Sequence, residues 1–184
     1  MTEKEKMING DYYNPMDEEL VKDRYNAKTL CHEYNKLSPK DDQIRIKMIE
    51  EIFHKQIYNC KVEPYFFCDY GYNVEIKGNF YANHNLVMLD ANKIIIGDHV
   101  FVGPNCGFYT SIHPTEKDLR NKGLEKALPI VIEDNVWIGG NVTVLAGVTI
   151  GENSIIGAGS VVTKDIPKNS IAVGNPCRVV KNNE

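Results

Sequence analysis

Aliphatic residues recur at every sixth position over about one sixth of the chain. The positions are Ile132, Ile138, Val144, Ile150, Ile156 and Val162. A second row of small or aliphatic residues lies four positions after each of these: Val136, Val142, Val148, Ser154, Ser160 and Ile166. A period of six fits neither the 3.6-residue turn of an amphipathic helix nor the two-residue alternation of an ordinary strand. A short fixed period is instead typical of a solenoid.

The six-residue period predicts a mainly β protein, a parallel β-helix. Each hexad would form one short strand and one corner, three hexads would close a triangular coil, and both rows would point inward. Successive coils would then pair in parallel about 4.8 Å apart. Gly139, Gly151 and Gly157 directly follow three of the inward aliphatics, where a Cβ would restrict the backbone of a turn. A chance spacing of ordinary strands is the alternative, and six matches in succession argue against it.

Residues 1–57 are expected to form a helical segment that packs on one end of the solenoid. Apolar residues at helical spacing predict helices over Asp17–Leu37 and Asp41–His54. The Asn14-Pro15 pair is a start signal for the first helix. Helices in this place would cover the sheet edge that stacked coils leave open.

The solenoid is expected to occupy residues 58–167, and residues 168–184 would form a C-terminal tail of the same structural domain. Before the regular repeat, six residues keep the period more loosely: Val62, Cys68, Val74, Ile96, Val102 and Phe108. The period therefore begins near residue 60 and runs to about residue 167, apart from one interruption.

That interruption covers residues 109–131, where the repeat stops and later returns in register. The stretch contains charged residues, glycine and two prolines. Long insertions without secondary structure are uncommon in compact domains and are often functional. We therefore expect an extended loop that carries a site.

Composition and charge exclude several classes of partner. The chain has 184 residues, which suits one domain. Its net charge of −4 and its lack of a basic run favour neither nucleic acid nor an anionic membrane as a partner. The charged N-terminus predicts no signal peptide, and no apolar run is long enough to span a bilayer. The five scattered cysteines form no C-x-x-C pair, so reduced thiols and a cytoplasmic location are expected.

Several short motifs follow one another along the chain. They are Glu3–Met7 with Gly10, Cys68–Asn73, Asn79–Asn83, His113–Pro114, Asn135–Gly140, Gly157–Asp165 and Gly174–Pro176. With these motifs in this order, the chain resembles the hexapeptide-repeat O-acetyltransferases, in particular the maltose and galactoside acetyltransferase branch, over essentially its full length. The resemblance implies acetyl transfer from acetyl-CoA to a sugar hydroxyl by a homotrimer. It also implies a left-handed coil, against the usual right-handed crossover, and active sites in clefts between neighbouring β-helices.

A sugar hydroxyl needs a base to take its proton as it attacks a thioester. His113 lies in the extended loop and matches the family's catalytic histidine, and histidine titrates near neutrality. Glu125 matches a glutamate of the maltose-type branch that would fix the histidine tautomer, although the galactoside branch has a different residue there. Asn83 matches the residue that stabilises the oxyanion and touches the sugar. The alternatives are a surface histidine, a solvated loop charge and a turn asparagine.

The resemblance also implies residues that bind the acceptor. Asp69 matches a family position that contacts substrate. Asp90 lies close to another such position, where the galactoside branch has two consecutive acids and this chain has Asp90 followed by Ala91. Asn14, with Tyr13 beside it, lies where the family's N-terminal segment reaches the sugar. Carboxylates are strong acceptors for hydroxyl groups.

For coenzyme A, the resemblance points to small residues that let the pantetheine arm lie close to the coils and to cations for its phosphates. The candidates are Trp137, Gly140, Ala158, Thr163, Lys164, Arg178 and Lys181. Each of the cations could instead be an ordinary solvated surface residue, and Trp137 could instead pack between subunits. Cys106 occupies an inward position and should be inert, so we expect direct transfer without an acyl-enzyme, and no metal.

Three other functions stay open. An acetyltransferase of this class could accept serine or an antibiotic instead of a sugar. A non-catalytic trimeric scaffold would use the coils for packing alone, although it would not need the loop that carries a histidine. A zinc enzyme similar to the γ-type carbonic anhydrases would need three histidines that converge across a subunit interface, and His84, His99 and His113 are available.

Overall fold

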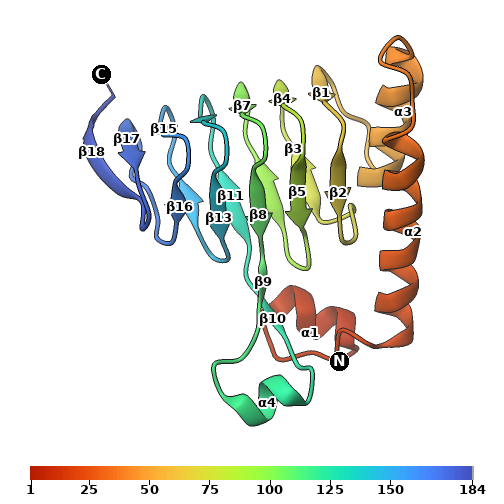
Figure 1. Ribbon diagram of the computed structural model, residues 1–184. Helices are drawn as coiled ribbons and strands as arrows, with labels where there is room; N and C mark the ends of the chain where they lie inside the picture. Colours follow the sequence, from red (N-terminus) through yellow and green to blue (C-terminus); the bar gives the residue numbers. More distant parts are fainter. Residues whose placement is uncertain (184) are drawn as a thin grey trace.

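The computed structural model describes residues 1–183. Figure 1 shows a row of strand-built coils with helices along one end. The helices are α1 (Glu3–Asn9), α2 (Glu18–Tyr34), α3 (Asp42–Phe53) and α4 (Lys117–Asn121). The two helices predicted from apolar spacing are present in the structure as α2 and α3.

Three sheets form the sides of the solenoid. The first sheet has the order β1 (Cys60–Val62), β4 (Phe80–Ala82), β7 (Val100–Val102), β12 (Trp137–Ile138), β15 (Ile155–Ile156), β17 (Ser170–Val173) and β18 (Arg178–Asn182). The second consists of β2 (Phe66–Cys68), β5 (Leu86–Leu89), β8 (Gly107–Tyr109), β13 (Thr143–Leu145) and β16 (Val161–Val162). The third consists of β3 (Val74–Ile76), β6 (Ile94–Ile96), β11 (Ile130–Ile132) and β14 (Thr149–Ile150). The strands of these sheets pair in parallel except for β18, which pairs antiparallel with β17. The chain visits the sheets in turn, so the predicted parallel β-helix is confirmed.

The two predicted rows form the interior of the coils. All six residues of the first row are 0% exposed, and those of the second row are at most 5% exposed. The same hydrophobic core extends to the helices, because Tyr34, Ile52 and Phe53 pack in one cluster with the strand residues. Burial of an aliphatic side chain contributes about 1.5–3 kcal/mol, so these rows are the main stabilising feature of the solenoid.

The glycines that follow the inward aliphatics serve close packing between coils. A Cβ on Gly139 would lie 2.7 Å from the backbone nitrogen of Ala158 in the next coil. The left-handed backbone conformation occurs two residues later in the hexad, for example at Asn141 with a φ of 58°. The expectation that these glycines serve a turn conformation is therefore wrong, and the neighbouring coil is what excludes a side chain.

The first coils are longer than the later ones. Val62 pairs with Ala82, twenty residues on, whereas Ile132 pairs with Ile150, eighteen residues on. The extra residues fall between the second and third sheets. Val74 is consequently out of phase: it is buried, but Ile76 pairs with Ile96 and takes the expected position.

Two edges of the triangular solenoid carry the candidate residues. We call the edge where the first sheet turns into the second the glycine corner; its stacked residues are Asn83, Gly103, Gly139 and Gly157. We call the edge where the second sheet turns into the third the loop corner. It contains residues 69–73, 90–93 and 110–129.

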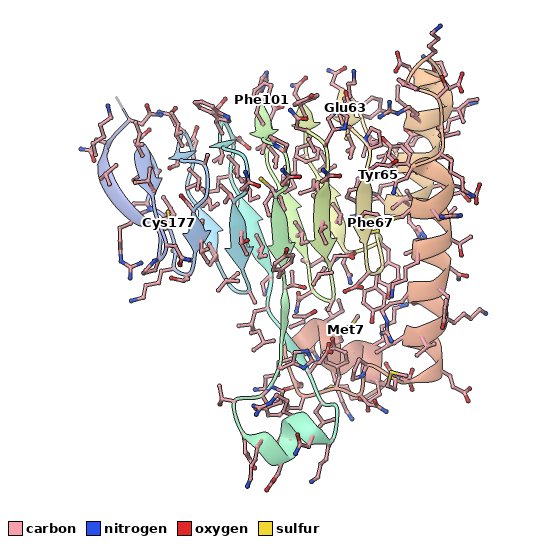
Figure 2. All side chains as sticks on the ribbon, viewed as in Figure 1. Met7, Glu63, Tyr65, Phe67, Phe101 and Cys177 are labelled. Atoms are coloured by element: carbon pink, nitrogen blue, oxygen red, sulfur yellow. The ribbon has the colours of Figure 1, made fainter. Side chains whose placement is uncertain are left out.

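The loop corner is covered by the N-terminal part of the chain. A small hydrophobic cluster joins them and consists of Met7, Tyr13, Leu20, Tyr70, Ala91 and Ala127. Figure 2 shows Met7 where α1 meets the base of the solenoid, and Phe101 of β7 at the opposite edge. The division into a helical segment, a solenoid and a tail stays a prediction. Within residues 1–183, no helix combines the length and apolar character needed to cross a membrane.

Candidate active site

The extended loop is a folded hairpin, which differs from the expectation of a segment without secondary structure. Its strands β9 (Ser111–Ile112) and β10 (Lys126–Ala127) pair antiparallel, and α4 lies between them. The guanidinium of Arg120 donates to the backbone oxygen of Pro114 at 2.7 Å and to that of Thr115 at 3.0 Å. These bonds connect α4 to the start of the loop and give the hairpin a defined shape.

The hairpin brings His113 and Glu125 together. Because Ile112 pairs with Lys126, the residues just beyond this pair, His113 and Glu125, lie opposite each other. Nε2 of His113 is 3.8 Å from Oε1 of Glu125. The histidine side chain is 64% exposed and the glutamate side chain is 20% exposed. A base that faces solvent and is backed by a half-covered carboxylate is suited to taking a proton from a bound hydroxyl.

The N-terminal segment contacts this pair. Tyr13 forms a β-bridge with Glu125, and its hydroxyl donates to Oε2 of Glu125 at 2.7 Å. The neighbouring Asn14 is exposed, and its side-chain oxygen accepts from the backbone nitrogen of Met16 at 3.0 Å. Asn14 directly follows the residue that contacts Glu125, and its expected contact with the acceptor stays a prediction.

Asn92 is a buried residue that sequence reasoning missed. Its NH2 group donates to the backbone oxygens of Met7, Ile8 and Ala127 at 3.2, 3.0 and 3.0 Å. It therefore ties the end of α1, the base of the loop and the solenoid together. The only signal in the sequence is a polar residue where the repeat is interrupted.

Asp69 and Asp90 lie at the loop corner on successive coils. Oδ1 of Asp90 accepts from the backbone nitrogens of Asp69 and Tyr70 at 2.9 and 2.8 Å. The Asp90 side chain is fully buried, which disagrees with the expected direct contact to an acceptor. Asp90 instead supports the backbone of Asp69, which is half-buried and lines a groove of about 950 Å³ beside α2.

Burial shifts the acidity of both carboxyls. Desolvation raises the pKa of Asp90 to about 7, and the nearby charge of Asp69 acts in the same direction, whereas backbone hydrogen bonds oppose the rise. Desolvation also raises the pKa of Asp69, opposed by the charges of Lys28 and Arg24. Oδ2 of Asp90 makes no hydrogen bond within residues 1–183, which is consistent with a carboxyl that favours its protonated form.

Asn83 begins the glycine corner and lies away from His113. Its side-chain oxygen accepts from the backbone nitrogen of His84 at 2.8 Å. On the outer face of the first sheet, Tyr81, Phe101 and Trp137 occupy equivalent positions of three coils. These residues line a groove of about 490 Å³ with Asn83, and Trp137 is 56% exposed.

The residues expected to bind coenzyme A are spread over the first sheet and both corners. Gly140 and Ala158 continue the glycine corner, and Arg178 and Lys181 lie on β18 at the end of the first sheet. Thr163 and Lys164 follow β16 and belong to the loop corner. One chain therefore does not bring all of these residues together, nor does it bring Asn83 to His113.

Metal ligands do not gather in the described part of the chain. No group of three or more His, Cys, Asp and Glu residues within residues 1–183 has the geometry to hold an ion. His84 and His113 lie at different corners, and His99 lies at the remaining edge after β6. All five cysteines are free.

The coils and the loop define the class: hexapeptide-repeat proteins with a β-helix and an inserted hairpin. Three family models match, described as a maltose acetyltransferase hexapeptide capping motif over residues 6–56, a hexapeptide repeat of succinyl-transferase over residues 93–113, and a bacterial transferase hexapeptide with six repeats over residues 129–164.

Individual relatives match over nearly the whole chain. The galactoside O-acetyltransferase of Escherichia coli (strain K12) is 44% identical over 96% of this chain and 87% of its own length. The crystal structure of a maltose O-acetyltransferase from Clostridium difficile 630 is 48% identical, covers 100% of this chain and 98% of that chain, and superposes with a TM-score of 0.98. A galactoside acetyltransferase in complex with coenzyme A is 42% identical, covers 100% and 92% of the two chains, and has a TM-score of 0.96.

The chain belongs to the hexapeptide-repeat acetyltransferases, in the branch of the maltose and galactoside acetyltransferases. It is thus an acetyltransferase with a left-handed β-helix, and the resemblance of its motifs is confirmed.

Proposed function

We propose that this protein transfers the acetyl group of acetyl-CoA to a hydroxyl of a sugar such as maltose, glucose or a galactoside. The observation that carries the proposal is the His113–Glu125 pair, held face to face by the hairpin. The names of the relatives, a maltose and a galactoside O-acetyltransferase, support a sugar as the acceptor.

In the proposed reaction His113 is the general base. It takes the proton of the acceptor hydroxyl as that oxygen forms a bond to the carbonyl carbon of the thioester. The tetrahedral intermediate then expels the sulfur of coenzyme A, which receives the proton back from His113. Glu125 stabilises the protonated imidazole and fixes its orientation. The 3.8 Å separation between them needs only a small side-chain rotation to become a hydrogen bond, as is common before substrate binds.

We infer that Asn83 stabilises the oxyanion from a second copy of the chain. Asn83 lies at the glycine corner and His113 on the loop corner, so the two meet when the glycine corner of one copy faces the loop corner of another. A closed ring of copies related by rotation produces such contacts repeatedly, and a homotrimer is the smallest ring in which two different surfaces meet at every interface. The exposed Phe101 and Trp137 beside Asn83 would be covered by that neighbour.

We propose that coenzyme A lies along the glycine corner. Gly140 has no side chain and Ala158 has a small one. The narrow pantetheine arm can therefore approach the backbone here, beside Trp137. Arg178 and Lys181, which are exposed at the end of the first sheet, would bind its phosphates, with Thr163 and Lys164 contributed by the neighbouring copy. The relative solved with coenzyme A supports this cofactor as co-substrate. The cytoplasmic location expected from the sequence stays a prediction.

A thiol-release assay with an acceptor panel tests the proposal. Acetyl-CoA is held fixed and offered with maltose, glucose, an alkyl galactoside, serine, chloramphenicol or no acceptor. We expect release with at least one sugar and none with serine or chloramphenicol. Release with serine or chloramphenicol alone would keep an acetyltransferase and overturn the sugar acceptor. Absence of release with every acceptor, from a well-folded oligomer, would favour the scaffold.

A further inference from the structure

We propose that Tyr13 is a positioning residue, which holds Glu125 so that one carboxylate oxygen stays directed at His113. Tyr13 acts through Glu125 and touches neither substrate, so the inference rests on the proposed function of the His113–Glu125 pair. Tyr13 lies outside the six-residue repeat, in the short segment between α1 and α2.

The two oxygens of Glu125 have different partners. Oε2 accepts the hydroxyl of Tyr13 at 2.7 Å, and Oε1 lies 3.8 Å from Nε2 of His113. Fixing one oxygen of a planar carboxylate fixes the direction of the other. Without the tyrosine hydroxyl, Glu125 could rotate about its side-chain bonds and turn both oxygens away from His113, because a glutamate side chain has several staggered rotamers of similar energy.

The backbone gives the contact a fixed register. The nitrogen of Tyr13 donates to the oxygen of Glu125 at 2.9 Å, and the nitrogen of Glu125 donates to the oxygen of Tyr13 at 3.1 Å. The two residues therefore exchange both backbone hydrogen bonds, as directly opposed residues of an antiparallel pair do. This bridge sets the distance between the two Cα atoms. The orientation of the Glu125 carboxylate is then set by the Tyr13 hydroxyl.

Tyr13 is itself held firmly and stays a donor. Its side chain is 1% exposed and packs with Met7, Leu20 and Ala127 in the cluster at the loop corner. Burial raises the pKa of Tyr13, and the charge of Glu125 and the hydrogen bond to it add to the rise. The phenol therefore keeps its proton and stays the donor to Glu125.

The competing explanation is that Tyr13 only packs the N-terminal segment against the loop. Tyr72 provides a matched control, because it packs against the same cluster and its hydroxyl donates to Asp23 at 3.0 Å, away from the hairpin. Tyr13→Phe and Tyr72→Phe each remove one hydroxyl and keep the ring, so both should fold.

The kinetic test uses acetyl-CoA with maltose on the oligomeric protein. Tyr13→Phe should lower kcat about tenfold, the value of one hydrogen bond to a charged group, with KM for both substrates changed less than about twofold. Tyr72→Phe should keep the wild-type kcat. In a Glu125→Ala background, Tyr13→Phe should cause no further loss, since the carboxylate that it positions is gone.

Several results would overturn the inference, and they are distinguishable from one another. A wild-type kcat for Tyr13→Phe, or a second tenfold loss in the Glu125→Ala background, would reduce Tyr13 to a packing residue. Equal losses in Tyr13→Phe and Tyr72→Phe would do the same. Full activity of Glu125→Ala would instead remove the proposed role of Glu125, and no activity of the wild-type protein with any sugar would remove the proposed function itself.

Discussion

The glycine corner and the loop corner are built on one repeat and differ in what the repeat permits. At the glycine corner each coil lies so close to the next that a Cβ on Gly103 would meet the backbone of Gly139 and Gly140. At the loop corner the extra residues lift the chain away from the coil, and Asp90 and Asn92 are buried there with their polar groups. The regular corner leaves room along its backbone for a narrow ligand, and the interrupted corner holds the buried polar groups and the His113–Glu125 pair.

Removing the base of the loop corner should have the largest effect. His113→Ala should lower kcat by about 10²–10⁴-fold, the usual contribution of a general base, and leave the free energy of unfolding within about 0.5 kcal/mol of wild type. His32→Ala is a matched control, because the His32 side chain is 66% exposed and that of His113 is 64% exposed. Steady-state kinetics and urea unfolding of both variants measure this. An active His113→Ala variant would remove the proposed base.

The buried carboxyl of the loop corner should make stability depend on pH. Below about pH 4 the Asp90 carboxyl is protonated in both the folded and the unfolded chain. Between there and its folded-state pKa of about 7, only the unfolded chain loses the proton, so the free energy of unfolding falls as pH rises. The total loss is roughly 4 kcal/mol near and above pH 7.

Asp90→Asn removes this term and keeps an oxygen for the backbone nitrogens of Asp69 and Tyr70. Urea unfolding at pH 4, 5, 6 and 7 should show the variant gaining stability relative to wild type as pH rises. A stability difference that is constant over this range would contradict the assignment of a raised pKa to Asp90.

Adding a side chain at the glycine corner should destabilise the protein. The Cβ of Gly103→Ala would lie 2.5 Å from the nitrogen of Gly140 and 2.7 Å from the carbonyl carbon of Gly139. Both neighbours are backbone atoms, so the coils must separate locally, at a cost of about 3 kcal/mol. Gly140→Ala is the control, since its Cβ would come no closer than 3.3 Å to its nearest neighbour, Pro104. Equal unfolding free energies for the two variants would show that the corners are not tightly stacked.

Cutting the tie between the N-terminal segment and the loop should have a smaller effect. Asn92→Ala leaves the backbone oxygens of Met7, Ile8 and Ala127 without their donor and should lower the free energy of unfolding by about 2 kcal/mol. It should also speed trypsin cleavage after Lys122 in the loop. Asn79→Ala is the control. The NH2 group that it removes donates to Asp98 near the surface, away from the loop, so we expect no faster cleavage in this variant. Unchanged cleavage in Asn92→Ala would show that the loop is held by other contacts.

The regular part of the fold could be predicted from the sequence because one physical requirement, burial of an aliphatic every six residues, repeats without exception from Ile132 to Val162. The early coils are harder to predict, because two extra residues per coil shift the phase of the repeat. The shift becomes visible only in the structure, where Ile76 and not Val74 pairs with Ile96. The role of the glycines could not be predicted, because a glycine that packs against the next coil and a glycine that adopts a turn conformation look identical in the sequence.

The candidate site could be predicted only in part. His113 and Glu125 were expected from the loop and the family resemblance, and the hairpin explains why they lie together. Tyr13 was expected near the sugar, and its bond to Glu125 joins residues 112 positions apart, which no local pattern reports. The role of Asn92 could not be predicted for the same reason, because its three hydrogen-bond partners are backbone oxygens of two segments that are distant in the sequence.

The central claim is that one active site takes His113 from the loop corner of one copy and Asn83 from the glycine corner of another. The most direct test mixes inactive His113→Ala and Asn83→Ala proteins, unfolds and refolds them together, and measures thiol release with acetyl-CoA and sugar. If the two residues come from different copies, random mixing in a ring restores about one quarter of wild-type activity. Mixed oligomers, verified by mass, that stay inactive would contradict the claim that the two residues meet in one site between copies.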